Sequence, residues 1–319
     1  MSQYRSCLPL LDSDRLFLAS GGLETSLVFH EGIDLPHFAS FTLLKDDAGV
    51  ALLEQHFDRF CSLARYRETG AMLDTPTWRA NRDWGQKLGY SESALEDVNR
   101  RAVDLLVRQR AKWQTPQTPV VIFGSLGPRG DGYQADTHMS VDEARDYHRT
   151  QIETFAATEA DLVGGNTLTY IDEAIGMALA ARACAMPIFL SFTVETDGRL
   201  PSGETLREAI ERADAETDSY ASFFMINCAH PTHFKSTLQS GGDWVQRIRG
   251  VRANASRRSH AELDQALKLD DGDPVELGEQ YKELKGLFLR RMSIVGGCCG
   301  TDVRHAEQMC RAIQRMEGA

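Results

Sequence analysis

Short apolar runs alternate along the chain with longer segments in which apolar residues recur at helical spacing. Eight runs are apolar almost without interruption, as is typical of parallel strands covered on both faces. They span residues 16–20, 71–75, 120–125, 161–165, 187–193, 223–228, 248–253 and 292–297. The pattern therefore predicts eight strands, each followed by a helical segment.

The helical segments carry signals for where they begin and end. Leu53, Phe57, Phe60 and Ala64 recur at steps of three and four, which predicts a helix with one apolar face and Gly70 as its stop. Side chains expected to cap later helices are Ser93 and Ser140, each with a glutamate three residues on, and Thr301 before the last helix.

Regular alternation of eight strands and helices is typical of the α/β class and of a (β/α)8 TIM-type barrel, and 319 residues suit one such domain. A doubly wound open sheet is the competing fold. Its usual mark is a G-x-G-x-x-G phosphate loop after the first strand, and residues 20–25 read SGGLET. We therefore expect one barrel domain over residues 1–319, with the polar stretch 254–286 as a solvated helix and loop.

Charge and composition exclude several classes of partner. The formal net charge of −11 argues against binding to nucleic acid or to an anionic membrane surface. No run approaches the roughly 18 apolar residues of a membrane span, and the N-terminal residues lack the pattern of a signal peptide. A cytoplasmic protein is the expectation, whereas the oligomeric state is not predicted.

Three of the seven cysteines follow predicted strands. Cys228 ends the sixth strand, and Cys298 and Cys299 end the eighth. Because the C-terminal ends of barrel strands share one mouth, we expect the three thiols to converge there. Thiolates are preferred ligands of Zn²⁺, and three protein ligands leave a fourth position open, as in catalytic sites. Gly296, Gly297 and Gly300 would let the chain turn sharply around the adjacent pair.

Other interpretations of these residues remain open. A single cysteine at a strand end is often a small core residue, and Cys298 with Cys299 could form a vicinal disulfide. In a reducing compartment, thiols, ligands or core residues are expected before disulfides. His230 could form a ligand pair with Cys228, but lining the site or orienting a ligand suits it better. The remaining cysteines are interpreted as structural: Cys7, Cys61, Cys184 and Cys310.

Several motifs together resemble the homocysteine S-methyltransferase family along nearly the whole chain. They are residues 21–25 (GGLET), 125–130 (SLGPRG), 202–204 (SGE), 227–228 (NC) and 296–301 (GGCCGT). The resemblance implies a (β/α)8 barrel whose zinc, held by Cys228, Cys298 and Cys299, binds homocysteine through its sulfur. It implies that backbone amides near Gly21 and Gly22 receive the amino-acid carboxylate. The expected substrate contacts are Gly21, Gly22, Glu24, Asn166, Asn227 and His230.

Two positions depart from the family pattern. After the fourth strand the family usually has a glutamate that pairs with the homocysteine ammonium, and here Asn166 stands at or near that place. The first strand ends in Ser20 where many members have aspartate. An amide accepts a hydrogen bond but brings no compensating charge. The nearby carboxylates that could substitute are Glu195, Asp172 and Glu173, and Asp74, Thr75 and Asn81 are expected to line the mouth.

The chemistry follows from a zinc-bound thiol. Such a thiol is deprotonated and can attack a methyl group on a positively charged donor. The resemblance suggests S-methylmethionine, S-adenosylmethionine or betaine as a small, diffusible donor, and we favour S-methylmethionine, with homocysteine giving methionine. Trp78, Trp84 and Tyr133 could stabilise the onium group by cation–π contact. The alternatives are a zinc hydrolase and a non-enzymatic zinc or redox sensor.

Overall fold

Eight parallel strands close into a barrel in sequential order, so each strand pairs with its neighbours in the chain and β8 pairs with β1. The computed structural model describes residues 2–12, 15–135 and 137–318. The strands are β1 (Phe17–Ala19), β2 (Gly70–Asp74), β3 (Val120–Leu126), β4 (Leu162–Leu168), β5 (Ile188–Phe192), β6 (Phe223–Asn227), β7 (Ile248–Ala253) and β8 (Ile294–Gly297). The predicted (β/α)8 barrel is confirmed.

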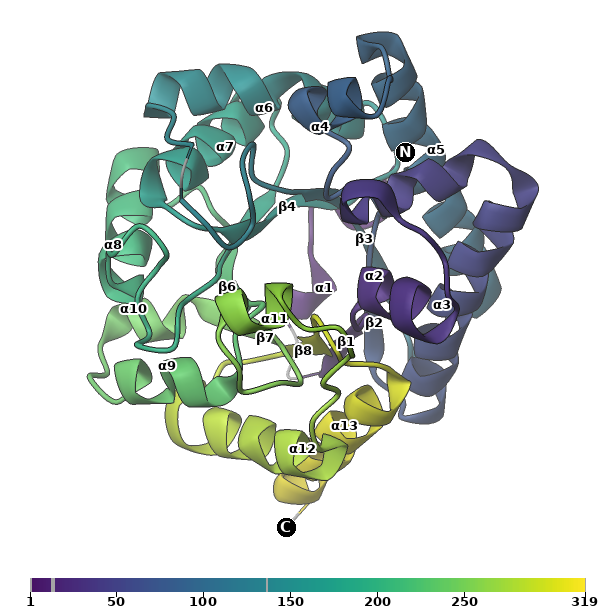
Figure 1. Cartoon of the computed structure of the whole chain (residues 1–319). Coiled ribbons are helices and arrows are strands. Elements are labelled where there is room, and N and C mark those ends of the chain that lie inside the picture. The colour runs from purple at the N-terminus through teal and green to yellow at the C-terminus, as the bar shows by residue number, and fades with distance from the viewer. Residues whose placement is uncertain (1, 13–14, 136, 319) are drawn as a thin grey trace.

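Helices surround the barrel, and Figure 1 looks along its axis with α1 in the middle. They are α1 (Pro9–Asp12), α2 (Leu23–Thr25), α3 (Asp47–Tyr66), α4 (Arg82–Lys87), α5 (Glu92–Trp113), α6 (Val141–Ala156), α7 (Ile171–Ala183), α8 (Leu206–Thr217), α9 (Pro231–Leu238), α10 (Asp243–Gln246), α11 (His260–Asp264), α12 (Pro274–Glu283) and α13 (Val303–Glu317). Short 3-10 and π-helical turns are η1 (Ser26–His30), η2 (Pro36–Phe38), η3 (Ser40–Lys45) and η4 (Leu284–Phe288). Within the described ranges, no helix has the length and apolar character needed to cross a bilayer.

The barrel interior has an apolar lower layer. Buried side chains from seven strands form it, together with two leucines of the N-terminal segment that holds α1: Leu8, Leu10, Phe17, Ala19, Met72, Val121, Phe123, Leu162, Phe189, Phe223, Met225 and Ile294. A second, larger apolar cluster lies between the strands and the outer helices. Burial on both faces explains why the strands are apolar almost throughout.

Polar side chains lie above this layer, at the C-terminal ends of the strands. They hydrogen-bond to one another between neighbouring strands and, for Arg252 with Asp74, between β7 and β2. The set comprises Ser20, Asp74, Ser125, Asn166, Ser191, Asn227 and Arg252, and we call it the polar ring. Barrel enzymes carry their active sites at the C-terminal ends of the strands, and the polar ring lies at that end. The apolar layer closes the other end.

The helix signals were confirmed in part. Ser140 and Glu143 form the predicted capping box of α6. The N-cap of α5 is Ser91 rather than Ser93, because the extended backbone and the accepted Ala94 N–H fall there. Gly70 was also wrongly assigned as a helix stop, since α3 ends at Tyr66 and Gly70 opens β2.

The last helix begins one residue later than predicted. Asp302 caps α13 by accepting the Arg304 N–H. Thr301, the predicted cap, instead donates its hydroxyl hydrogen to the Cys298 carbonyl at 2.7 Å. The Thr301 side chain, which the sequence pattern assigned to the cap of α13, therefore stabilises the loop that contains Cys298 and Cys299.

One buried histidine makes stability depend on pH. His56 lies on α3 between the rings of Phe57 and Phe60, at centroid distances of 5.5 and 5.0 Å. Its Nε2 has no hydrogen-bond partner among the described residues. Burial lowers the pKa of His56 from 6.5 to about 4, because the imidazolium cannot be solvated there.

We predict that His56→Leu removes part of this pH dependence. The unfolded chain takes up the proton first as pH falls, so the histidine destabilises the fold progressively between pH 6.5 and 4. Between pH 7.5 and 5 the wild-type loss attributable to His56 should be about 2 kcal/mol. Urea unfolding at both pH values measures it, with the exposed His30→Leu as control. A loss of equal size in the His56 variant would contradict the assignment.

Candidate metal centre

Three cysteine sulfurs meet at the C-terminal end of the barrel. The Sγ atoms of Cys228, Cys298 and Cys299 all lie within 4.8 Å of one another, which brings together residues about 70 positions apart in the chain. Cys228 and Cys298 form a disulfide with a Cα–Cα distance of 5.3 Å, and Cys299 is a free thiol. The convergence agrees with the sequence prediction. The expectation of thiols, metal ligands or core residues before disulfides does not hold for this bonded pair, and the bonded pair is not the vicinal one.

Strand β7 holds the two cysteine segments in place. The Cys228 N–H donates to the Arg252 carbonyl at 3.0 Å, and the Cys298 N–H donates to the Ala253 carbonyl at 2.8 Å. Just beyond the strand, the Asn254 side chain donates to the Cys228 carbonyl and accepts the Cys299 N–H, at 3.0 and 3.1 Å. The two segments are therefore fixed against a common support.

Asn227 fixes the conformation around Cys228. Its Oδ1 accepts from the Thr167 N–H at 3.0 Å, and its Nδ2 donates to the Thr167 hydroxyl at 2.8 Å and to the Cys228 sulfur at 3.4 Å. Thr167 and Cys228 both have left-handed backbone conformations, with φ of 58° and 54°. A β-branched residue rarely adopts that region, and such strain is found at functional sites where the surroundings enforce it.

The glycines around Cys298 and Cys299 have two different roles. Gly300 has a φ of 79°, so it supplies the conformational freedom that the turn requires. Gly297 lies so close to Thr301 that a Cβ atom would overlap the threonine side chain. The predicted sharp turn is thus made at Gly300, and Gly297 permits close packing.

Aromatic and titratable side chains cover the cysteines. The Tyr133 hydroxyl lies 3.3 Å from the Cys299 sulfur, and its ring stacks on His260 at a centroid distance of 4.0 Å. His260 bonds through Nε2 to the Cys228 carbonyl at 2.7 Å and through Nδ1 to Glu195 at 3.1 Å. Burial raises the pKa of the Tyr133 hydroxyl well above its usual value, so the hydroxyl stays protonated.

The donor set suits a soft divalent cation. Among the described residues, the only group with metal-ligand spacing consists of these three sulfurs, without histidine or carboxylate. Burial raises the pKa of Cys299 to about 11, so the thiolate needs a compensating cation. The thiolate and not the disulfide is the ligand, so a metal would be held by the reduced form. The residues present therefore fit zinc.

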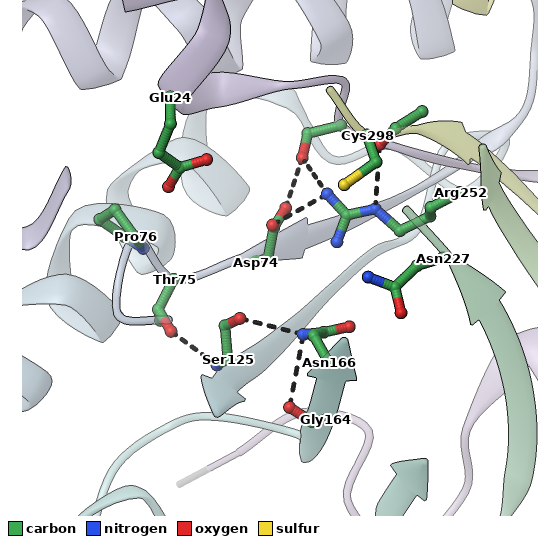
Figure 2. Close-up of polar contacts among 12 residues, drawn as sticks. Glu24, Asp74, Thr75, Pro76, Ser125, Gly164, Asn166, Asn227, Arg252 and Cys298 are labelled. Atoms are coloured by element: carbon green, nitrogen blue, oxygen red, sulfur yellow. Dashed lines mark hydrogen bonds and ion pairs between the residues drawn. The ribbon is translucent and has the colours of Figure 1, made fainter. Parts of the chain in front are cut away.

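An ion pair occupies the polar ring beside the cysteines. Arg252 donates from Nη2 to Asp74 at 3.0 Å and to the Ser20 hydroxyl at 3.1 Å, and from Nε to the Gly297 carbonyl at 3.3 Å. Ser20 in turn donates to Asp74 at 2.5 Å. Figure 2 shows the guanidinium between Asp74 and Cys298. The residue is only 8% exposed, so this is a buried charge next to the candidate metal ligands.

Comparison with known proteins decides the family. The profile of the homocysteine S-methyltransferase family matches residues 17–313. This chain belongs to the homocysteine S-methyltransferase family. It is 22% identical to homocysteine S-methyltransferase 1 of Arabidopsis thaliana, over 93% of each chain. It is 28% identical to the homocysteine S-methyltransferase of Escherichia coli (strain K12), over 66% of this chain and 69% of that one.

The fold agrees with this family. The metallated form of the homocysteine methyltransferase MmuM from Escherichia coli superimposes with a TM-score of 0.75 at 21% identity, covering 95% of this chain and 98% of that one. At this identity the likeness establishes the barrel fold and nothing about the site.

Figure 2 labels the two amides of the polar ring, Asn166 and Asn227, together with Cys298. Asn166, at the place of the family glutamate, donates to the Ser125 hydroxyl at 3.0 Å. Its Oδ1 is buried and has no partner among the described residues. Glu24 accepts from the Ser40 hydroxyl at 2.7 Å, and burial raises its pKa. Substrate contacts by Asn166, Glu24 and Asn227 stay predictions, and Asn227 also holds Thr167 and Cys228 within the protein.

The other predicted contacts have partners within the protein. The Gly22 N–H donates to the Thr301 carbonyl at 3.1 Å, so this amide is engaged. His230 caps α9 by accepting the Thr232 N–H and is outside the cysteine group. Burial, with a contribution from His233, lowers the pKa of His230 to about 4. Substrate roles for Gly21, Gly22 and His230 stay predictions.

The carboxylates named as substitutes for the missing glutamate pair elsewhere. Asp172 forms an ion pair with Arg212, Glu173 is buried against His148, and Glu195 contacts His260. None of these three pairings in the described part of the chain involves Asn166. The carboxylate in the polar ring is that of Asp74, which the sequence analysis expected to line the mouth.

Two of the three aromatic candidates are already in contact with cationic side chains. The Arg79 guanidinium lies 4.0 Å from the Trp78 ring centroid and 3.9 Å from that of Trp84, and Lys87 also covers Trp84. Asn81 caps α4 by accepting the Trp84 N–H, and its place in the lining of the mouth stays a prediction. Tyr133 alone of the three aromatics contacts the cysteine group.

Sequence reasoning missed Arg252, Asn254 and His260. Two arginines interrupt β7, whose sequence IRGVRA was interpreted as an apolar strand, and a charge inside a buried strand was the available signal. His260 lies in the polar stretch between β7 and β8, where nothing in its spacing indicates a contact with Cys228.

We predict that metal-free protein oxidised in air links Cys228 to Cys298. Their Cα–Cα distance of 5.3 Å is within the usual range for a disulfide. Peptide mapping without reductant should identify this cross-link and find Cys299 alkylated after denaturation. A cross-link between Cys298 and Cys299 would contradict the arrangement described.

Proposed function

We propose that this protein transfers a methyl group from a small onium donor, with S-methylmethionine favoured, to the thiol of homocysteine, and that zinc held by Cys228, Cys298 and Cys299 activates the thiol. Membership of the family supports S-methyl transfer. The observation that carries the zinc proposal is the meeting of the three sulfurs within 4.8 Å at the mouth of the barrel.

The metal would supply one function. Zinc held by Cys228, Cys298 and Cys299 would lower the pKa of an acceptor thiol, so that the thiol would react as a thiolate at neutral pH. In the transfer itself, the acceptor sulfur uses a lone pair to form a bond to the methyl carbon. The donor's C–S bond breaks, and its electron pair stays on the departing sulfur. Homocysteine and S-methylmethionine thus become two molecules of methionine, and the thiol proton is released.

The protein's own groups would position the reacting sulfur and limit water. Asn227 and Asn254 hold the cysteine segments through hydrogen bonds between 2.8 and 3.4 Å. Tyr133 and His260 cover Cys299 and the Cys228 carbonyl. Because the sulfonium charge is neutralised as the new bond forms, the rate gain comes mainly from holding sulfur, methyl and leaving group in line.

We predict that Cys298→Ala loses both zinc and methyl transfer while keeping the barrel. The cysteine lies beyond the end of β8, so its loss leaves the strands intact. Metal analysis of protein prepared with reductant, circular dichroism and methionine formation test the three parts. Cys184→Ala, at the C-terminus of α7, is the control and should keep both properties.

The same measurements separate the alternatives. Normal methyl transfer by Cys298→Ala would overturn the ligand assignment. Hydrolysis without any thiol would favour a zinc hydrolase. Absence of stoichiometric zinc from reduced wild type would favour a redox sensor.

We also predict that Asn227→Ala weakens zinc binding by about 10- to 100-fold, as loss of partners around metal ligands commonly does. The substitution frees Thr167 and Cys228 from the amide that holds them. Competition with a zinc chelator on reduced protein measures the affinity. Asn166→Ala removes an amide from the same ring that has no bond to a cysteine, and its zinc affinity should stay within about threefold. Equal losses in both variants would argue against a specific role for Asn227.

A further inference from the structure

Arg252 is a buried cation with an unused nitrogen beside the candidate thiol site. Its Nε and Nη2 are bonded to Gly297, Ser20 and Asp74, and no hydrogen bond joins Nη1 to another described residue. Figure 2 shows the guanidinium next to Cys298, with this third nitrogen directed toward the side where Asn166 and Asn227 lie. The three occupied contacts fix the plane of the guanidinium, so Nη1 has a defined direction.

The position of Arg252 is set by the barrel itself. In the strand register it lies opposite Asn227 of β6 and Gly296 of β8. Those two strands carry Cys228 and the Cys298–Cys299 pair at their ends. A ligand whose sulfur is held by the cysteine group therefore has its next few atoms within reach of the guanidinium.

Stability alone does not explain a buried ion pair at this position. Burying an arginine and an aspartate costs several kcal/mol of desolvation per ion, which their attraction often fails to exceed. The Asp74 side chain is 17% exposed and that of Arg252 10%, so the pair is shielded but reachable. Guanidinium groups with a free edge are the side chains best suited to bind a carboxylate.

The groups around the polar ring that could bind an ammonium group of a ligand are less suitable than Arg252 is for a carboxylate. Asp74 is already engaged by Arg252 and Ser20. Asn166 offers the unpartnered Oδ1, which can accept one hydrogen bond but carries no charge. Glu24 is hydrogen-bonded to Ser40, and burial disfavours its ionised form.

We propose that the acceptor thiol is selected by its carboxylate, which binds Nη1 of Arg252, and that an α-ammonium group contributes little to selection. The inference rests on the proposed function, because it names the acceptor class of that site. It extends the accepted substrates from homocysteine to mercapto-carboxylic acids of similar length that lack the amino group.

Four thiols that share the same three-carbon chain next to the sulfur test the proposal. Homocysteine carries both charged groups, 4-mercaptobutanoate only the carboxylate, 3-mercaptopropylamine only the ammonium, and 1-propanethiol neither. Dissociation constants from calorimetry on reduced, zinc-loaded protein are measured first, followed by kcat/KM with S-methylmethionine. In wild type the dissociation constants of homocysteine and 4-mercaptobutanoate should agree within about tenfold. Those of 3-mercaptopropylamine and 1-propanethiol should be about 100-fold higher, the size expected for the loss of one charged hydrogen bond.

The variants separate binding from support of the fold. Arg252→Gln alone leaves Asp74 without its partner, so the double variant R252Q/D74N preserves the charge balance. In both variants the dissociation constants of the four thiols should lie within about tenfold of one another, because only the preference for a carboxylate is lost. Arg249→Gln, on the same strand near the floor of the barrel, is the matched control and should retain the wild-type order of the thiols. Asn166→Glu should increase the preference for homocysteine over 4-mercaptobutanoate by about tenfold.

Several results would overturn the inference. They are an equal loss for all four thiols in R252Q/D74N, a wild-type preference for 3-mercaptopropylamine over 4-mercaptobutanoate, and no binding of any thiol. Methyl transfer without a carboxylate preference overturns the inference and leaves the proposed function standing. Carboxylate-selective binding without methyl transfer supports the inference and counts against the proposed donor.

Discussion

Barrel closure in sequential order is the constraint on which the site depends. It places β7 between β6 and β8, so the two strand ends that carry the cysteines are held on either side of a single strand. The hydrogen bonds from residues 252–254 then fix both cysteine segments. Neither segment could position a metal ligand set alone, because each supplies only one or two sulfurs.

The same closure explains the two layers of the interior. Side chains of each strand alternate between the interior and the helices, and successive inward positions stack in layers along the barrel axis. The lower layer is apolar and densely packed, and the upper layer is the polar ring, whose members satisfy one another across strands. The charge pair of Arg252 and Asp74 is therefore largely shielded from water, and its electrostatic effect on a ligand is larger there than in bulk water.

The sequence was sufficient for those features that burial or composition marks strongly. All eight strands were predicted, because parallel strands packed on both faces are apolar nearly throughout, and the bounds agree within two residues except at the end of β4, which extends three residues further. The adjacent cysteines between glycines indicated the candidate metal centre for a similar reason, since core packing seldom requires that arrangement. The cap of α5 was misplaced because Ser91 and Ser93 both suit the position, and only the backbone conformation chooses between them.

What the sequence could not supply was the contact partners of polar side chains. Arg252 and Asp74 are separated by 178 positions, and nothing in the local pattern of either residue indicates the other. The disulfide partner of Cys298 was equally hidden, because Cys299 is adjacent in sequence and Cys228 is the one within bonding distance. Such pairings depend on strand register and side-chain direction, which appear only once the barrel is closed.

The packed floor of the barrel has a kinetic consequence. Leu8 and Leu10, together with the rings of Phe17, Phe189 and Phe223, fill that end, so in the described part of the chain the approach to the sulfurs is from the C-terminal side. Two substrates that share one entrance and react at its bottom must arrive in sequence, with the deeper one first. The departing molecules must leave in the reverse order, which makes the enzyme sensitive to whichever product blocks the exit.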